Sequence, residues 1–428
     1  MAFASIAFVS LMLLGIPIAF VVGLVSMWLM FDVGGAQFML LVPQRVFAGL
    51  NVFTIMAIPF FFLAAELMTA SKAIEDIVKF ADALVGRLRG GLAHVNVMAS
   101  ALFSTMSGSA LADIATLGSI EIKAMETMGY DRRFATALTV ASSIIGAIIP
   151  PSIILMLYAS IAQVSVAAIF LASIVPGLLL IGLLMGLVVV MARKHNFPRR
   201  ETPYSPKEFW QISVDAALPL AMPVIILGGI LSGMFTATEA AAVAVGYILI
   251  VGLFIKKTLK LSDIPGCMLR AGIMTSVIFM VLATANVFGW FIGLERIPEN
   301  IANSLIGVAS DPVTLLLLIV GVLLIVGMFM DSGAALIVMA PILAPVAVSG
   351  GVHPIHFGIV MALTLVVGLT TPPVGPCLFA AASVSKLKIE TISRAMLPFY
   401  GLQVIFLLIL VLVPEVSLAL PRAAGFIN

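Results

Sequence analysis

Two stretches of this sequence, far apart in the chain, repeat the same pair of motifs, and each pair contains groups that can bind a small cation. In the first half, Met-Ser-Gly-Ser-Ala at 106–110 is followed by Gly-Ala-Ile-Ile-Pro-Pro at 146–151. In the second half, Asp-Ser-Gly-Ala-Ala at 331–335 is followed by Gly-Leu-Thr-Thr-Pro-Pro at 368–373. Proline lacks a backbone N–H and glycine turns freely, so carbonyl oxygens before each Pro-Pro pair lose their helical partners. Together with nearby hydroxyls they make an uncharged oxygen cage, which suits a hard cation such as Na⁺.

We therefore predict one Na⁺ site at each pair of motifs. Glycine and proline that only kink a packed helix are the alternative explanation, and the duplication of the whole arrangement argues against it. Several ligands would contribute only main-chain oxygen, and Asp331 could equally cap the helix that follows it. The predicted first site contains Ser104, Ser107, Gly108, Gly146, Ile149 and Ser152, and the predicted second site contains Gly327, Asp331, Ser332, Gly368, Thr371 and Val374.

An anionic substrate beside these cations would have no basic side chain to bind, because the motif segments contain no Lys, Arg or His at their centres. Helix N-termini, hydroxyls and the bound cations would have to hold it. Asp113 would repel an anion, so we expect it either to orient other groups or the ions, or to hydrogen-bond the turn. The predicted substrate residues are Ser107, Ser109, Asp113 and Thr370, with Ser142 and Ser143 as weaker candidates.

The composition places these motifs in a membrane. Of 428 residues, 62% are hydrophobic and 10% are charged, and the mean hydropathy is +1.24. A soluble domain has about 25% charged residues, so we predict an all-α protein that crosses the bilayer several times. We expect no enzyme, because the P-loop and His-Glu-x-x-His motifs are absent, and an ion gradient must then drive any transport. The continuous apolar spans are 2–31, 50–70, 134–163, 165–192, 216–234, 238–256, 268–292, 355–384 and 393–418.

Two more apolar segments, 92–125 and 313–349, have a small polar break near the middle, so we predict re-entrant helical hairpins. Basic residues collect in four loops, which the positive-inside rule places in the cytoplasm. Both ends of the first hairpin then lie inside and both ends of the second outside, with the N-terminus inside and the C-terminus outside. The two halves are therefore predicted to be inverted-topology repeats, each with a re-entrant hairpin and a broken transmembrane helix.

Other segments complete the predicted architecture. Segment 71–91 has one apolar and one charged face, so we predict an amphipathic helix along the cytoplasmic interface, capped by Ser71. Glu66 is expected to pair with another helix or to snorkel, and Glu239 to cap a helix or to dock an outside partner. The predicted units are scaffold helices of repeat 1 (1–70), the interfacial helix (71–91), hairpin 1 with its broken helix and the following span (92–192), a cytoplasmic linker (193–215), scaffold helices of repeat 2 (216–292), and hairpin 2 with its broken helix and the last span (313–418).

These motifs resemble the large membrane subunit of tripartite ATP-independent periplasmic (TRAP) transporters, the DctM/SiaM family. Examples are Ile-Pro-Phe-Phe-Phe-Leu-Ala-Ala-Glu-Leu-Met at 58–68 and Ser-Gly-Ser-Ala-Leu-Ala-Asp at 107–113. One departure is Ala237, where the family has proline in the Thr-x-Thr-Glu turn; the turn is less stiff, and the predicted Na⁺ sites are not affected. The likeness covers nearly the whole chain, and its other segments are 15–20, 129–132, 141–152, 236–243 and 368–375.

The resemblance implies more than the residues themselves. It implies an elevator-type transporter of the ion-transporter superfamily, in the inner membrane of a bacterium, coupled to at least two Na⁺ ions. The partners would be a small four-helix membrane subunit and a periplasmic substrate-binding protein, and the substrate an organic acid such as sialic acid, another sugar acid or a C4-dicarboxylate. The alternative is a stand-alone carboxylate symporter, coupled to Na⁺ or H⁺, that works without partner subunits.

Overall fold

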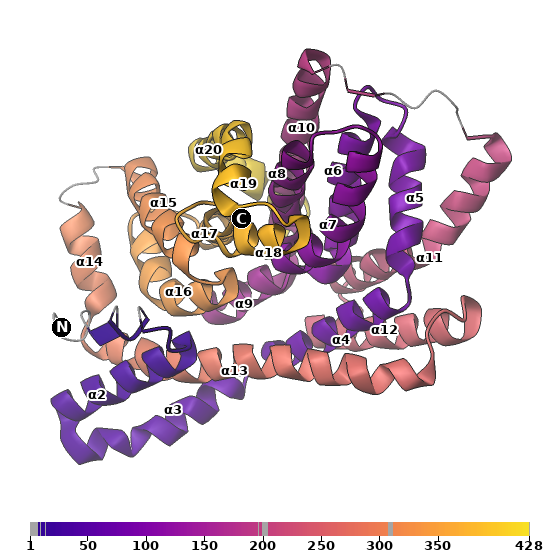
Figure 1. The fold of residues 1–428 in the computed structure, drawn as a ribbon. Coiled ribbons are helices and arrows are strands. Elements are labelled where there is room, and N and C mark those ends of the chain that lie inside the picture. The colour runs from indigo at the N-terminus through magenta and orange to yellow at the C-terminus, as the bar shows by residue number, and fades with distance from the viewer. Residues whose placement is uncertain are drawn as a thin grey trace.

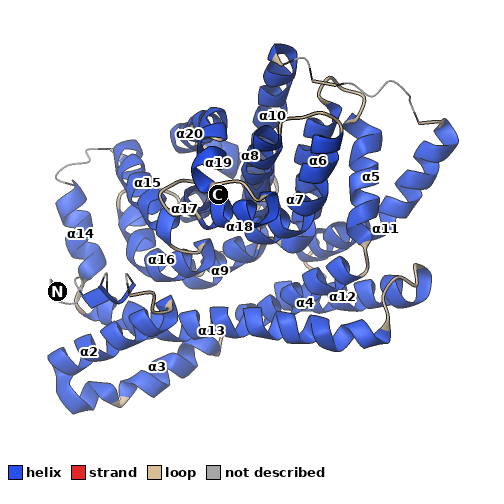
Figure 2. Cartoon of the chain, viewed as in Figure 1, coloured by secondary structure: helices blue, strands red, loops and turns tan. Residues whose placement is uncertain are grey.

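The computed structural model describes residues 7–8, 10–12, 14–195, 197–198, 204–306 and 311–427, without the side chains of 104–107 and 302–306. All secondary structure in this part of the chain is helical, as Figure 2 shows. The first half contains α2 (Ile18–Met39), α3 (Leu41–Leu50), η1 (Phe53–Met56), α4 (Ala57–Ala70), α5 (Ala73–Val85), α6 (Gly91–Ser107), α7 (Ala110–Thr127), α8 (Arg132–Ser143), η2 (Ile144–Ala147), α9 (Ile153–Ala162) and α10 (Val166–Lys194). The second half contains α11 (Pro206–Leu231), α12 (Ala237–Ile250), η3 (Val251–Ile255), η4 (Leu261–Asp263), α13 (Ile264–Leu294), α14 (Ile297–Ile306), α15 (Pro312–Phe329), α16 (Ser332–Ser349), α17 (Pro354–Leu369), α18 (Pro376–Ser385), α19 (Ile389–Ala395), α20 (Leu397–Leu412) and α21 (Glu415–Ala423).

Eight of the described helices are long and apolar enough to cross a membrane, and the bent pair α19 and α20 would make a ninth. The prediction of a helical, multi-pass membrane protein is therefore confirmed. The eight include α15 and α16, the two arms of the second predicted hairpin. Each has 18 residues, or about 27 Å at 1.5 Å per residue. That length is close to the thickness of the hydrocarbon layer, so length does not separate a re-entrant arm from a span.

The helices pack in two groups (Figure 1). The long helix α13 contacts α2, α3 and α4, and α4 also packs against α12. These helices lie along the lower edge of Figure 1, while α6 to α9 and α15 to α18 lie above them. Buried apolar side chains of both groups join in one large core, and a separate cluster packs α2 against the end of α13.

Each hairpin turns at a residue that caps the helix after it. Ser109 precedes α7, and its hydroxyl oxygen accepts a hydrogen bond from the N–H of Ala112 (3.4 Å). Asp331 precedes α16, and its carboxylate accepts from the N–H groups of Gly333 (2.9 Å) and Ala334 (3.4 Å). Such caps satisfy N–H groups that have no partner inside the helix. Asp331 therefore caps its helix, as one of the two interpretations predicts.

Both Pro-Pro segments interrupt a helix. In the first half, α8 and η2 end at Ala147, and α9 starts only at Ile153, after Ser152 caps it. In the second half, α17 ends at Leu369, and α18 starts at Pro376. The peptide bonds Pro150-Pro151 and Pro372-Pro373 are both cis. Paired prolines remove consecutive N–H donors, so neither helix can run through them.

The first apolar span differs from the predicted 2–31. The described helix α2 runs from Ile18 to Met39, after a turn in which Gly15 has φ +78° and Pro17 is the cap. Proline favours the start of a helix and glycine the end of one, so the two residues set the boundary. The sequence was read as one span because the apolar run continues through both residues.

The amphipathic helix α5 spans Ala73–Val85, inside the predicted 71–91. The prediction that Ser71 caps it is wrong: the cap position is Lys72 (φ +57°), and the Ser71 hydroxyl donates to the carbonyl of Met68 (2.7 Å). Two side-chain contacts hold α5 to other parts of the chain. Lys256, after η3, donates to Asp76, and the Tyr204 hydroxyl donates to Asp82 (2.7 Å).

Helix α11 already covers residues 206–215 of the predicted linker, because Ser205 and Glu208 form a capping box that starts it at Pro206. Helix α14 lies between the predicted span 268–292 and the predicted hairpin 313–349, where no element was predicted. Glu66 accepts a hydrogen bond from Arg270 (2.6 Å), so it pairs α4 with α13, as one of its two interpretations predicts.

The turn before α12 is a second capping box. The N–H of Glu239 donates to the Thr236 hydroxyl (3.3 Å), and the Glu239 carboxylate accepts from the Thr236 N–H (2.8 Å). We expect Thr236→Ala to cost about 1 kcal/mol of stability, because it removes this cap. Thermal unfolding of the purified protein measures the loss. In the matched control Thr275→Ala, the lost hydroxyl only donates to the carbonyl one turn back, Ala271, and an equal loss in the control would contradict the capping role.

Candidate functional site

The second Pro-Pro break lies directly against the first arm of the second hairpin. A Cβ added to Gly327 on α15 would lie 2.7 Å from the carbonyl oxygen of Leu365 and 3.1 Å from Cα of Gly368. A Cβ on Gly368 would in turn lie 2.7 Å from Cα of Gly327. The two backbones touch, and only glycine allows this approach. The structure thus brings together two of the residues predicted for the second Na⁺ site.

The turn after the break is also tied to α15. The N–H of Gly375 donates to the carbonyl of Met328 (2.9 Å). A Cβ on Gly375 would lie 2.8 Å from the carbonyl oxygen of Thr371 and 3.2 Å from that of Leu369, so two main-chain oxygens converge there. The Thr371 hydroxyl, which is half-buried, donates to the carbonyl of Val367 (2.9 Å). Val374 lies in this turn, and Asp331 and Ser332 follow α15 in the chain.

The first break faces the tip of the first hairpin. A Cβ on Gly108 would lie 3.4 Å from the carbonyl oxygen of Pro151 and 3.6 Å from the N–H nitrogen of Ile153. The Ser152 hydroxyl donates to the carbonyl of Ala147 (2.6 Å), across the break. Gly146 is buried, and Ile149 packs against Gly177 on α10. The side chains of the other two predicted ligands, Ser104 and Ser107, lie outside the described part of the structure.

The helix that follows each break packs against the hairpin of the other half of the chain. Helix α9, which follows the first break, packs against α16 of the second hairpin, and α18, which follows the second break, packs against α7 of the first. The hairpins and breaks of the two halves therefore form one compact unit.

The predicted substrate residues whose side chains are described are hydrogen-bonded or buried within the protein. Ser109 caps α7, and Asp113 is only 1% exposed. The Thr370 hydroxyl donates to Val367 (2.8 Å), and the Tyr400 hydroxyl donates to the Thr370 carbonyl (2.9 Å). Thr370 thus packs toward α20. The weaker candidate Ser142 accepts from Ser100 (3.0 Å).

A buried polar network that sequence reasoning missed joins the hairpin to α8. The Asn96 amide on α6 donates to Glu121 on α7 (2.5 Å) and to Thr139 on α8 (2.8 Å). Its amide oxygen accepts from the Ser142 hydroxyl (2.9 Å). Polar groups in a low-dielectric interior are stable only when they are paired, so the network fixes the position of the hairpin.

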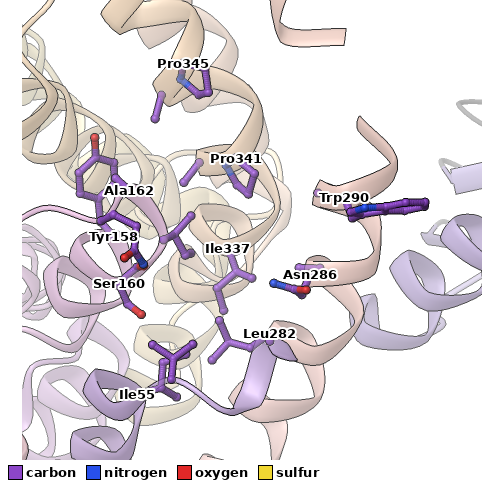
Figure 3. A pocket seen from close by; sticks show the side chains of 18 of the residues that line it. Ile55, Tyr158, Ser160, Ala162, Leu282, Asn286, Trp290, Ile337, Pro341 and Pro345 are labelled. Carbon is purple, nitrogen blue, oxygen red and sulfur yellow. The ribbon is translucent and has the colours of Figure 1, made fainter. Parts of the chain in front are cut away.

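A cavity of the described structure lies elsewhere, between the two groups of helices. Its volume is about 620 Å³, within the ~300–1,000 Å³ usual for small-molecule sites. In Figure 3, Leu282 and Asn286 of α13 lie on one side with Ile337 of α16 next to them, and Tyr158 and Ser160 lie on the other side. The cavity is also lined by Arg45 and Gly49 of α3, and by none of the predicted substrate residues whose side chains are described.

Arg45 and Asn286 were missed by sequence reasoning. Arg45 is the only charged residue between Asp32 and Glu66. A single charge in a long apolar stretch could have marked it as a candidate site residue. Asn286 lies in an otherwise apolar helix, where an amide side chain is also unusual. Their proximity was not predictable, because it depends on how α3 packs on α13.

Comparison with known proteins gives consistent matches. The model of the family "Tripartite ATP-independent periplasmic transporter, DctM component" matches residues 5–416. The chain is 39% identical over 379 residues to the sialic acid TRAP transporter large permease protein SiaM of Vibrio cholerae, covering 89% of this chain and 88% of that one. It is also 39% identical over 382 residues to the C4-dicarboxylate TRAP transporter large permease protein DctM of Pseudomonas aeruginosa, covering 89% of each.

Two further matches extend this picture. The isethionate TRAP transporter permease protein DctMQ of Oleidesulfovibrio alaskensis is 36% identical over 411 residues, which cover 96% of this chain and 65% of that longer protein. Among solved structures, the Alcanivorax borkumensis YdaH transporter matches with a TM-score of 0.63 over 89% of each chain. Its sequence identity is 14%, so this match concerns the fold.

Proposed function

This chain belongs to the DctM family, the large permease components of TRAP transporters, and from that premise we propose that it imports an organic acid together with at least two Na⁺ ions. The observation that carries the proposal is the duplicated break. Gly327 and Gly368 bring α15 against the second break, and Gly108 packs on the first. Main-chain carbonyls at such turns are suitable ligands for Na⁺. The residues proposed to bind Na⁺ are those predicted for the two sites.

We also propose that the halves are inverted repeats that work as an elevator. The unit formed by α6 to α10 and α15 to α20 would be the transport domain, and α2 to α4 with α11 to α13 the scaffold. Support comes from the matching caps at Ser109 and Asp331 and from the reciprocal packing of α9 on α16 and α18 on α7. The cavity between the two groups lies where one would slide against the other.

The partners and orientation follow from membership of the family and from charge. We propose that a small four-helix membrane subunit completes the scaffold and that a periplasmic protein delivers the substrate. The relative named DctMQ is longer than this chain, as a permease fused to a second subunit would be. From the positive charge of the basic loops we propose that the chain lies in a bacterial inner membrane, with its N-terminus in the cytoplasm and its C-terminus in the periplasm.

Reconstitution tests the proposal. We expect uptake of sialic acid or of a C4-dicarboxylate into liposomes only when three conditions hold: an inward Na⁺ gradient, the small subunit, and the binding protein loaded with its ligand. A K⁺ gradient of the same size is the control. Uptake by this chain alone would favour a stand-alone symporter, and uptake without Na⁺ would contradict the proposed coupling ion.

A further inference from the structure

We propose that the cavity between α3, α13, α9 and α16 binds an organic anion with a single carboxylate, and that Arg45 recognises this carboxylate. The inference rests on the proposed function, because it names the class of acid that the permease accepts. Sialic acid belongs to this class and the C4-dicarboxylates do not, so the cavity distinguishes between the substrates of related permeases.

The charge of the cavity carries the first step. Among the described residues that line it, Arg45 is the only one with a formal charge, and none is Asp or Glu. Within the described residues, no carboxylate lies within 4.0 Å of the Arg45 guanidinium. The guanidinium instead lies 5.0 Å from the centre of the Trp290 ring. This contact orients the guanidinium, and its N–H donors can still form a bidentate pair of hydrogen bonds to a carboxylate.

Helix packing holds Arg45 next to the polar groups of α13. Gly49 lies one turn after Arg45, and a Cβ added to it would lie 2.6 Å from Cβ of Asn286. Trp290 lies one turn after Asn286, so the two pairs of residues face each other across the contact between α3 and α13. The position of Arg45 beside the cavity is therefore set by backbone packing rather than by a mobile loop.

The opposite wall offers hydrogen bonds to the body of the ligand. Ser160 faces the cavity across from Asn286, and its hydroxyl accepts from Thr54 (3.2 Å). Asn286 is exposed on the cavity side (Figure 3) and can both donate and accept. The remaining lining is largely apolar, with Ile337 and Leu282 among its members.

The single positive charge decides between acids with one and two carboxylates. A second carboxylate in this cavity would face apolar side chains without a cation, and leaving a charge unpaired in such surroundings is strongly unfavourable. Hydroxyl and amide groups on the ligand would instead pair with Asn286 and Ser160. The geometry points to a monocarboxylate with a hydrogen-bonding body.

Fluorescence of Trp290 tests this inference without transport. The chain has three tryptophans, so Trp28→Phe with Trp210→Phe leaves Trp290 as the only reporter. In lipid nanodiscs, we expect sialic acid to change its emission in a saturable way, and succinate to have no effect at tenfold higher concentration. Arg45→Gln should weaken the affinity for sialic acid by about 10- to 100-fold, since a charge-assisted hydrogen bond is lost. The substitution Arg45→Lys should weaken the affinity for sialic acid less than Arg45→Gln does.

Calorimetric titration repeats the measurement, because removing Arg45 also changes the starting emission of Trp290. The matched control is Arg422→Gln, which removes an arginine paired with Glu415 on α21. Equal affinity for succinate and sialic acid, or unchanged affinity in Arg45→Gln, would overturn the inference while Na⁺-driven uptake by the wild-type complex continued. Loss of that uptake would instead overturn the proposed function.

Discussion

Gly327→Ala is expected to abolish Na⁺-driven uptake and to destabilise the protein. The added Cβ would lie 2.7 Å from a carbonyl oxygen of α17. Backbone atoms cannot rotate away as a side chain can, so α15 and α17 must separate at the proposed second Na⁺ site. Overpacking of this kind costs about 1–3 kcal/mol. Thermal unfolding at several NaCl concentrations and uptake by the reconstituted complex measure the two effects.

Gly321→Ala is the matched control for this variant. Gly321 lies on the same helix, and a Cβ there would meet no atom within 4 Å. We expect it to keep uptake and to leave stability unchanged or raised by up to about 1 kcal/mol, because alanine favours helix over glycine. If Gly327→Ala kept the same Na⁺ dependence as Gly321→Ala, the close contact of α15 with α17 would not be needed for ion binding.

Thr371→Val is expected to raise the Na⁺ concentration for half-maximal uptake about tenfold, while leaving membrane insertion intact. The substitution keeps the shape of the side chain and removes one oxygen from the proposed second site. Losing a contact worth about 1.4 kcal/mol weakens the affinity for Na⁺ about tenfold. The measurement is initial uptake rate against Na⁺ concentration in liposomes with both partners present.

Thr364→Val separates the lost ligand from the lost hydrogen bond. The hydroxyl of Thr364 donates to the carbonyl one turn back, Val360 (2.7 Å), as that of Thr371 does to Val367 (2.9 Å). Both variants therefore lose the same kind of hydrogen bond to a carbonyl of α17, but Thr364 lies away from the break. An equal shift in Na⁺ dependence for both variants would rule out Thr371 as a ligand.

Local sequence predicted the features that depend on local chemistry. Pro150-Pro151 and Pro372-Pro373 had to interrupt their helices because consecutive N–H donors are missing. Capping was one of the two interpretations of Glu239, because a threonine precedes it at the right spacing, and the capping box is present. The prediction that Ser71 caps α5 was wrong for a related reason. A serine before a helix can also bond to other backbone groups, and the Ser71 hydroxyl donates to the carbonyl of Met68 instead.

Long apolar runs were less informative at their ends. The run through Gly15 and Pro17 looked like one span, but the backbone preferences of these two residues start the helix at Ile18. Helix α14 was not predicted because the charged residues of its segment indicate exposure to solvent, and an exposed segment can still be helical. The apolar segments were nevertheless enough to predict a helical protein with several membrane spans.

The sequence alone determined that this chain crosses a membrane as helices, that two of them are broken, and that it resembles the DctM family, because composition, proline and glycine act through local backbone chemistry. Only the tertiary structure decided that Gly327 touches Gly368, that α9 and α18 pack on the hairpins of opposite halves, and that Arg45 lies beside Asn286 at a cavity. These contacts join residues far apart in the chain. They depend on how side chains of different helices fit together, which no local pattern specifies.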